Sequence, residues 1–281
     1  MTESKELVNT NGNDVIPFDM TPDYLPTSVK NTGVESLGKD DYKTPRIVLT
    51  QGLSPELETF QGIAKKDHFW HTGMNVNLGQ EFSFIPITAN KRVILFRPRN
   101  DQGGGILAFS KNGKTWDSGA NQTFQAKIKG RKEPVSWNTR KDVLSSRLTE
   151  FGTSNPDEPH SAPAASVIYE YLVYLPEHPE LSPCVIGLSK TAIPNGKTFN
   201  TSLAMIARTG KPICSLNVRC FVENMNNDDG EWTVPNFKLM GWVGNKDLFN
   251  IVKGVADSYS DYNVDYTQEE VAPIVDDEIK Y

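Results

Sequence analysis

The apolar residues of this chain come in short, often β-branched runs that turn residues interrupt. Such runs are typical of strands, and many short strands bury their apolar faces by packing sheet on sheet or by curling one sheet on itself. The sequence therefore predicts a mainly β chain with a few helices, a β-rich α+β fold built as a small barrel or sandwich with elaborated loops. We expect strands in the following segments: 45–50, 81–87, 91–99, 103–110, 122–128, 165–175, 183–189, 213–224 and 231–243.

Two segments place their apolar residues at helical intervals instead. They are 198–208 and 245–259, and Asn245 is a suitable N-cap for the second. The sequence Thr-Ala-Asn at 88–90 predicts a turn between two strands. The polar segment 129–165 is expected to be a long mobile loop with a short helix near 143–148.

Charge divides the chain into three parts. Residues 1–42 hold eight acids and three lysines, and residues 257–281 hold eight acids and one lysine. The body between them is basic, although the net charge of the whole chain is −6. We therefore expect a disordered N-terminal arm (1–43), one main domain (44–259) and an acidic C-terminal tail (260–281).

The basic character is concentrated in residues 86–147, which carry thirteen Lys and Arg against four acids. Three of the five tryptophans lie in or just before this stretch. Cations neutralise phosphates, and exposed aromatic rings stack on unpaired bases, so this mixture favours single-stranded nucleic acid. The expected phosphate contacts are Lys91, Arg92, Arg97, Arg99, Lys114, Lys127, Lys129, Arg131, Lys132, Arg140 and Lys141. The expected stacking residues, with rings open to solvent, are Trp70, Phe96, Trp116 and Trp137, although core packing is an equally good interpretation of any single tryptophan.

Catalytic and cofactor motifs are not predicted. Two Gly-Lys-Thr tripeptides, at 113–115 and 196–198, resemble the end of a phosphate-binding P-loop, but Ala108 and Thr191 stand where the motif needs an earlier glycine. His68 and His71 lack further ligands at a recognisable spacing, so we expect no metal site there. The three cysteines form no CxxC pair and are expected to be reduced, mostly buried thiols. We predict no enzyme activity and no cofactor.

The chain ends in three acids followed by two apolar residues, which is more than a solubilising tail needs. The expected partner-binding tail consists of Asp276, Asp277, Glu278, Ile279 and Tyr281. This ending resembles that of bacterial single-stranded DNA-binding proteins, in which acids precede an Ile-Pro-Phe tip. Here Lys280 and Tyr281 replace the last two of these residues.

The body resembles instead a group of phage-encoded proteins in the segments PRIVLTQGLSPEL, KRVILFRPR, GGGILAFSKNGKTW, LSKTAIPNGKTFNTSL and FKLMGWV. That resemblance implies an OB-fold over roughly residues 44–259. It also implies a bacteriophage single-stranded DNA-binding protein that acts in DNA replication or recombination, in the cytoplasm of the infected host. Its tail would recruit replication or recombination proteins.

Two other interpretations remain open at this point. One is a phage virion or assembly protein without a replication role, which a polar arm and a loop-rich β body also fit. The other is a metal-dependent nuclease that uses Asp101, Asp117 or Asp142, although no spacing brings these acids together.

Overall fold

A computed structural model of the chain describes residues 9–10, 13–14, 33–36, 41, 43–98, 101, 104–228 and 230–259. Most of the expected N-terminal arm, Arg99 and the whole acidic tail lie outside these residues. None of the helices among the described residues is long and apolar enough to cross a membrane.

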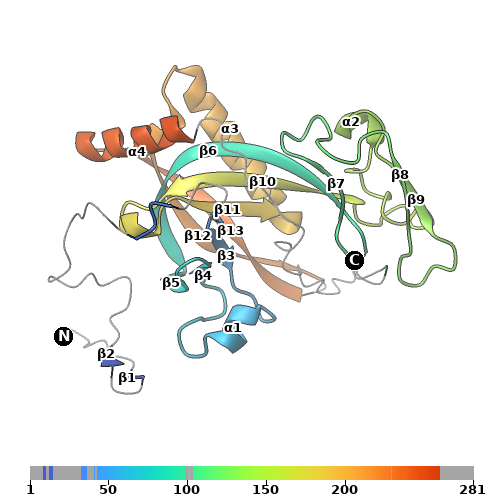
Figure 1. Ribbon diagram of the computed structural model, residues 1–281, viewed down its shortest axis with the longest axis horizontal. Helices are drawn as coiled ribbons and strands as arrows, with labels where there is room; N and C mark the ends of the chain where they lie inside the picture. The colour runs from blue at the N-terminus through green and yellow to red at the C-terminus, as the bar shows by residue number, and fades with distance from the viewer. Residues whose placement is uncertain are drawn as a thin grey trace.

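The fold is a curled half-barrel of strands with few helices (Figure 1), so the predicted β-rich α+β class is confirmed. The half-barrel is compatible with the OB-fold-like barrel that the resemblance implied. The strands are β1 (Asn9–Thr10), β2 (Asn13–Asp14), β3 (Arg46–Leu49), β4 (Phe69–His71), β5 (Val76–Gly79), β6 (Glu81–Phe96), β7 (Ile106–Ser110), β8 (Thr123–Ala126), β9 (Val135–Asn138), β10 (Ala165–Tyr174), β11 (Cys184–Ser189), β12 (Leu216–Asn227) and β13 (Gly230–Trp242). The helices are α1 (Pro55–Thr59), α2 (Val143–Ser146), α3 (Ile193–Arg208) and α4 (Lys246–Ser258), with short 3₁₀ turns η2 (Pro179–Leu181), η3 (Lys190–Ala192) and η4 (Ile213–Ser215).

The main sheet has the strand order β13-β12-β6-β10-β11-β3-β4-β5, and β7 pairs with the far part of β6. All pairs are antiparallel except β11 with β3. The predicted turn at 88–90 is wrong, because β6 is one continuous strand of 16 residues. Thr88, Ala89 and Asn90 pair with Leu172, Tyr171 and Glu170 of β10, and the irregularity is a bulge one residue earlier.

The curl of the sheet is visible in its first hydrophobic cluster. Ile47 of β3 and Phe69 of β4 share this cluster with Val234 of β13, which stands at the other end of the strand order. Strands so far apart in a sheet share a core only if the sheet wraps around it. Helix α3 adds Phe199 and Leu203 to this inner core, and α4 packs Val252 against a separate cluster on the opposite face of the sheet.

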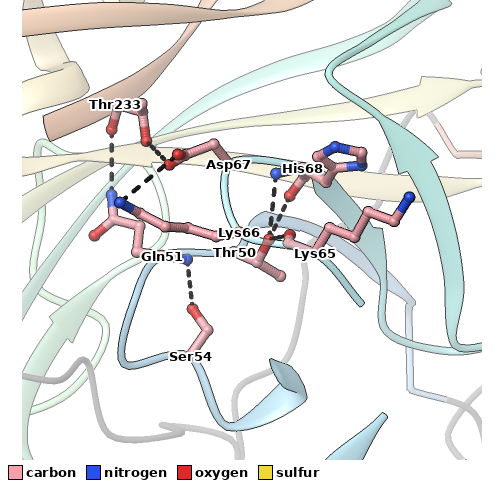
Figure 2. Close-up of polar contacts among 8 residues, drawn as sticks. All are labelled: Thr50, Gln51, Ser54, Lys65, Lys66, Asp67, His68 and Thr233. Carbon is pink, nitrogen blue, oxygen red and sulfur yellow. Dashed lines mark hydrogen bonds and ion pairs between the residues drawn. The ribbon is translucent and has the colours of Figure 1, made fainter. Parts of the chain in front are cut away.

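Side chains, not a further strand, connect the edge strand β13 with the elements it approaches (Figure 2). The Gln51 side-chain amide donates to the Thr233 carbonyl at 3.2 Å, and the Thr233 hydroxyl donates to the Asp67 carboxylate at 2.8 Å. The Asn195 amide, in the first turn of α3, donates to the Pro235 carbonyl at 3.1 Å. The bonds from Gln51 and Asn195 occupy carbonyls at the edge of the sheet, where another strand could otherwise pair.

A third cluster forms the core of what we call the outer module, residues 104–164, where β6 ends and β10 begins (Figure 1). Trp116, Trp137 and Leu148 pack there against Val93 and Leu95 of β6. The segment expected to be a long loop thus contains β9, the predicted short helix α2 and buried core residues.

The cysteines are reduced and buried as predicted, and two of the histidines are hydrogen-bonded. All three cysteines are free and buried. The His71 ring is buried; it accepts from the Met74 amide and contacts the Leu181 carbonyl, and burial lowers the pKa of its imidazole. His68 contacts the Asn77 side chain at 3.0 Å.

Candidate nucleic-acid interface

The three predicted stacking tryptophans are not at the surface. Trp70 is 1% exposed, Trp116 6% and Trp137 4%, so the expectation of solvent-open indoles is wrong. Trp116 donates to the Thr139 carbonyl at 2.8 Å and Trp137 to the Thr153 carbonyl at 2.9 Å. A buried indole is stable where its N–H has a main-chain acceptor, and these carbonyls allow tryptophans in polar sequence surroundings to fill a core.

Phe96, the fourth stacking candidate, lies at the end of β6 and is partly exposed. A ring that sequence reasoning missed is Phe151, which is 69% exposed. The turn that carries it is fixed by hydrogen bonds: Gly152 donates to the Ser161 carbonyl at 2.7 Å, and the Thr153 hydroxyl donates to the carbonyls of Leu148 and Glu150. A large apolar side chain held in water on an ordered turn is a better candidate for contact with a base than the buried indoles.

One predicted phosphate contact is a core residue. Arg92 is 3% exposed and forms an ion pair with Glu170, itself 2% exposed, on the face of the sheet opposite to Lys91. Arg46 reaches the same carboxylate at 3.2 Å. Successive side chains of β6 point to opposite faces of the sheet, so Lys91 and Arg92 lie on different faces. Arg92 therefore does not contact a DNA strand that is bound beside Lys91.

Two other predicted arginines are half-buried and already paired. Arg97 binds Asp101 at 3.2 Å, and Arg131 binds Asp157 at 3.0 Å. Arg99 lies outside the described residues. The remaining predicted cations are exposed: Lys91, Lys114, Lys127, Lys129, Lys132, Arg140 and Lys141.

The exposed cations fall into two groups. Lys127, Lys129 and Lys132 lie in the turn between β8 and β9, at the tip of that hairpin. Arg140 and Lys141 follow the base of the hairpin, where the Asn121 amide donates to the Arg140 carbonyl at 2.7 Å. The structure thus separates residues that sequence spacing had treated as one set.

Two further exposed lysines, Lys114 and Lys91, extend the second group beyond the base of the hairpin. The Val143 amide donates to the Lys114 carbonyl at 2.9 Å, and Thr115 forms an antiparallel bridge with Asp142. Lys114 therefore stands opposite Val143, two positions along the facing segment from Lys141. The turn at Gly113 brings this segment close to Lys91. The φ of Gly113 is +67°, and a β-carbon there would lie 2.8 Å from the Lys91 side chain. We call Lys91, Lys114, Arg140 and Lys141 the lysine track.

The acids near the track are held by local contacts. Asp142 caps α2 and accepts from the Ser145 amide at 2.7 Å, and this bond lowers the pKa of its carboxyl. Asp117 accepts from the Lys111 amide at 2.6 Å, and Asp101 pairs with Arg97. The three acids considered for a nuclease therefore have separate partners. In the part of the chain that the structure describes, no group of three or more His, Cys, Asp or Glu is placed to hold a metal ion.

Comparison with known protein families identifies the family of this chain. No curated protein and no solved structure matches the chain. Residues 11–265 match the profile of a phage protein family, and this match covers most of the 281 residues. The chain therefore belongs to the Pam3 phage gp34-like protein family.

Proposed function

We propose that this phage protein binds single-stranded DNA without sequence preference and without catalysis, and that it acts in phage DNA replication or recombination in the infected cell. The observation that supports the proposal most is the lysine track, whose four cations are exposed. They come from three separate segments that are linked by the hydrogen bond between Val143 and Lys114 and by the close approach of Gly113 to Lys91. A row of cations that follows a surface suits a flexible polyanion, because each phosphate that a cation neutralises releases a counterion.

Single strands fit this surface better than duplex. Helix α2, in the outer module, has four residues, which is too short to read a major groove. Phe151, in the same module, offers a ring for an unpaired base, and base stacking of this kind tolerates any sequence.

Charge reversal on the track tests the proposal. We expect the triple variant Lys91→Glu, Lys114→Glu, Lys141→Glu to bind a labelled dT oligomer much more weakly than the unchanged protein. The slope of log affinity against log salt should fall by about 0.7 for each phosphate that the variant no longer neutralises. Fluorescence anisotropy of the labelled oligomer is the suitable measurement, because the buried tryptophans give little reason to expect quenching.

A matched control reverses three exposed lysines of the half-barrel that lie away from the outer module: Lys65, Lys211 and Lys246. We expect this control to retain most of the affinity. The proposal fails if the unchanged protein does not bind dT at low salt, or if both triple variants lose affinity equally. Parallel titrations with rU and with a duplex of equal length decide the class of nucleic acid. A stoichiometric place in purified particles, without DNA binding, would support the assembly interpretation instead.

The proposed tail function calls for a truncation placed by the structure. Helix α4 ends at Ser258, and Tyr259 still packs against the core, so the cut belongs after Tyr259. We expect deletion of residues 260–281 to leave dT affinity equal or higher, because acids that compete with phosphate are removed, and to abolish capture of replication or recombination proteins. Clearly weaker dT binding by the truncated protein would contradict this role.

A further inference from the structure

Both Gly-Lys-Thr tripeptides adjoin the same pair of side chains. Lys91 of β6 stands directly opposite Tyr169 of β10. A β-carbon at Gly113 would lie 2.8 Å from the Lys91 side chain, and one at Gly196 would lie 2.7 Å from the Tyr169 ring. The two glycines thus allow the turn at Gly113 and the first part of α3 to approach neighbouring strands, whose usual separation is about 4.8 Å.

These side chains form a row on one face of the sheet. Residues directly opposite each other in an antiparallel pair share a face, so Lys91, Tyr169 and Leu188 of β11 line up across three strands. Leu188 is buried in the inner core that α3 covers, whereas Tyr169 is partly exposed and Lys91 is exposed. The row therefore begins at Leu188, which α3 covers, and ends at the exposed Lys91 beside the outer module.

Each tripeptide is held in place by its surroundings. In the first, the Asn112 side chain accepts from the amides of Lys114 at 2.8 Å and Thr115 at 2.9 Å. In the second, the Gly196 carbonyl accepts from the Tyr171 hydroxyl at 3.3 Å. The turn before it is fixed by Asn195, which donates to Glu223 at 2.9 Å.

Both lysines of the tripeptides, Lys114 and Lys197, are exposed. Glu223 lies near the second tripeptide, but its carboxylate already accepts from Asn195 and from Asn236 at 3.0 Å. Neither tripeptide has the preceding glycine of a P-loop, so neither wraps a nucleotide triphosphate by itself. Exposed lysines on two backbone segments that closely approach Lys91 and Tyr169 suit a chain of phosphates that passes over this pair.

We propose that Lys114 and Lys197 bind phosphates of one and the same DNA strand, which crosses β6 and β10 over Tyr169. This proposal rests on the proposed single-strand binding and extends it. The lysine track continues beyond Lys91 to α3, and the bound strand is not confined to the outer module.

Single charge reversals in the full chain test this path by anisotropy with a dT oligomer. We expect Lys197→Glu to weaken binding as much as Lys114→Glu, with each lowering the salt slope by about 0.7. The matched control is Lys211→Glu, an exposed lysine just beyond the other end of α3, which should bind like the unchanged protein. Thermal melting checks that each variant is folded.

The outcomes separate the two proposals. If Lys114→Glu weakens binding while Lys197→Glu behaves like Lys211→Glu, the crossing path is refuted and the proposed function stands. If the unchanged protein does not bind, both proposals fail. A second measurement is photocrosslinking to a bromodeoxyuridine oligomer followed by mass spectrometry. A crosslinked peptide that contains Tyr169 supports the path, and crosslinks confined to residues 104–164 overturn it.

Discussion

Replacement of Trp137 by alanine is expected to lower the free energy of unfolding by about 3–5 kcal/mol, the usual cost of truncating a buried aromatic residue to alanine. The ring is 4% exposed and packs in the core of the outer module. The change also leaves the Thr153 carbonyl without its indole donor. Urea denaturation followed by circular dichroism measures the effect, since the substitution removes a fluorophore.

Trp242 provides the matched control, because it is a tryptophan that is 56% exposed at the end of β13. We expect Trp242→Ala to change the free energy of unfolding by less than about 1 kcal/mol. If Trp137→Ala instead left stability unchanged and abolished oligonucleotide binding, the indole would lie at the surface, as its polar sequence neighbours suggested.

Replacement of Glu170 by glutamine is the second large effect, and we expect it to destabilise the fold by about 3–5 kcal/mol. Glu170 is the carboxylate that faces two guanidiniums, those of Arg92 and Arg46. Arg92 is almost fully buried, so its charge has little access to water once the carboxylate charge is removed. Urea denaturation again gives the free energy of unfolding.

Two comparisons isolate the cause of this effect. Glu81→Gln removes a carboxylate that pairs with Arg219 at 3.5 Å on the surface, and we expect it to cost less than about 1 kcal/mol. The double variant Arg92→Met, Glu170→Leu removes both buried charges and should be more stable than Glu170→Gln alone. A Glu170→Gln protein as stable as the Glu81→Gln protein would show that the buried pair is not needed for stability.

The spacing of apolar residues predicted most strands and helices well. An element that buries one face repeats its apolar residues at the period of a strand or of a helix, and this repeat can be read in the sequence. The runs at 165–175 and 183–189 became β10 and β11, and Asn245 caps α4 by accepting from the amides of Asp247 and Leu248. The error at 88–90 has a physical reason. Ala89 and Asn90 are weak strand formers, but pairing with β10 holds them extended all the same.

The candidate site was only partly predictable. Charge marks Lys114 and Lys141 as surface residues, since an unpaired lysine is rarely buried. Arg92 escaped this rule because its partner, Glu170, is 78 positions away in sequence and meets it only through strand register. Trp137 was misjudged because β9 alternates: Val135 and Trp137 face inward, while Ser136 and Asn138 supply the polar surroundings.

The strands β6 and β10 run without a break through two separate cores. β6 gives Phe84 to the inner core and Val93 to that of the outer module, and β10 gives Tyr171 to the first and Ala165 to the second. Cutting the chain at one point cannot separate the half-barrel from the outer module as two intact units, because β6 and β10 each form part of both cores. Shortened forms for crystallisation or binding work must therefore trim the ends of the chain and keep both halves together.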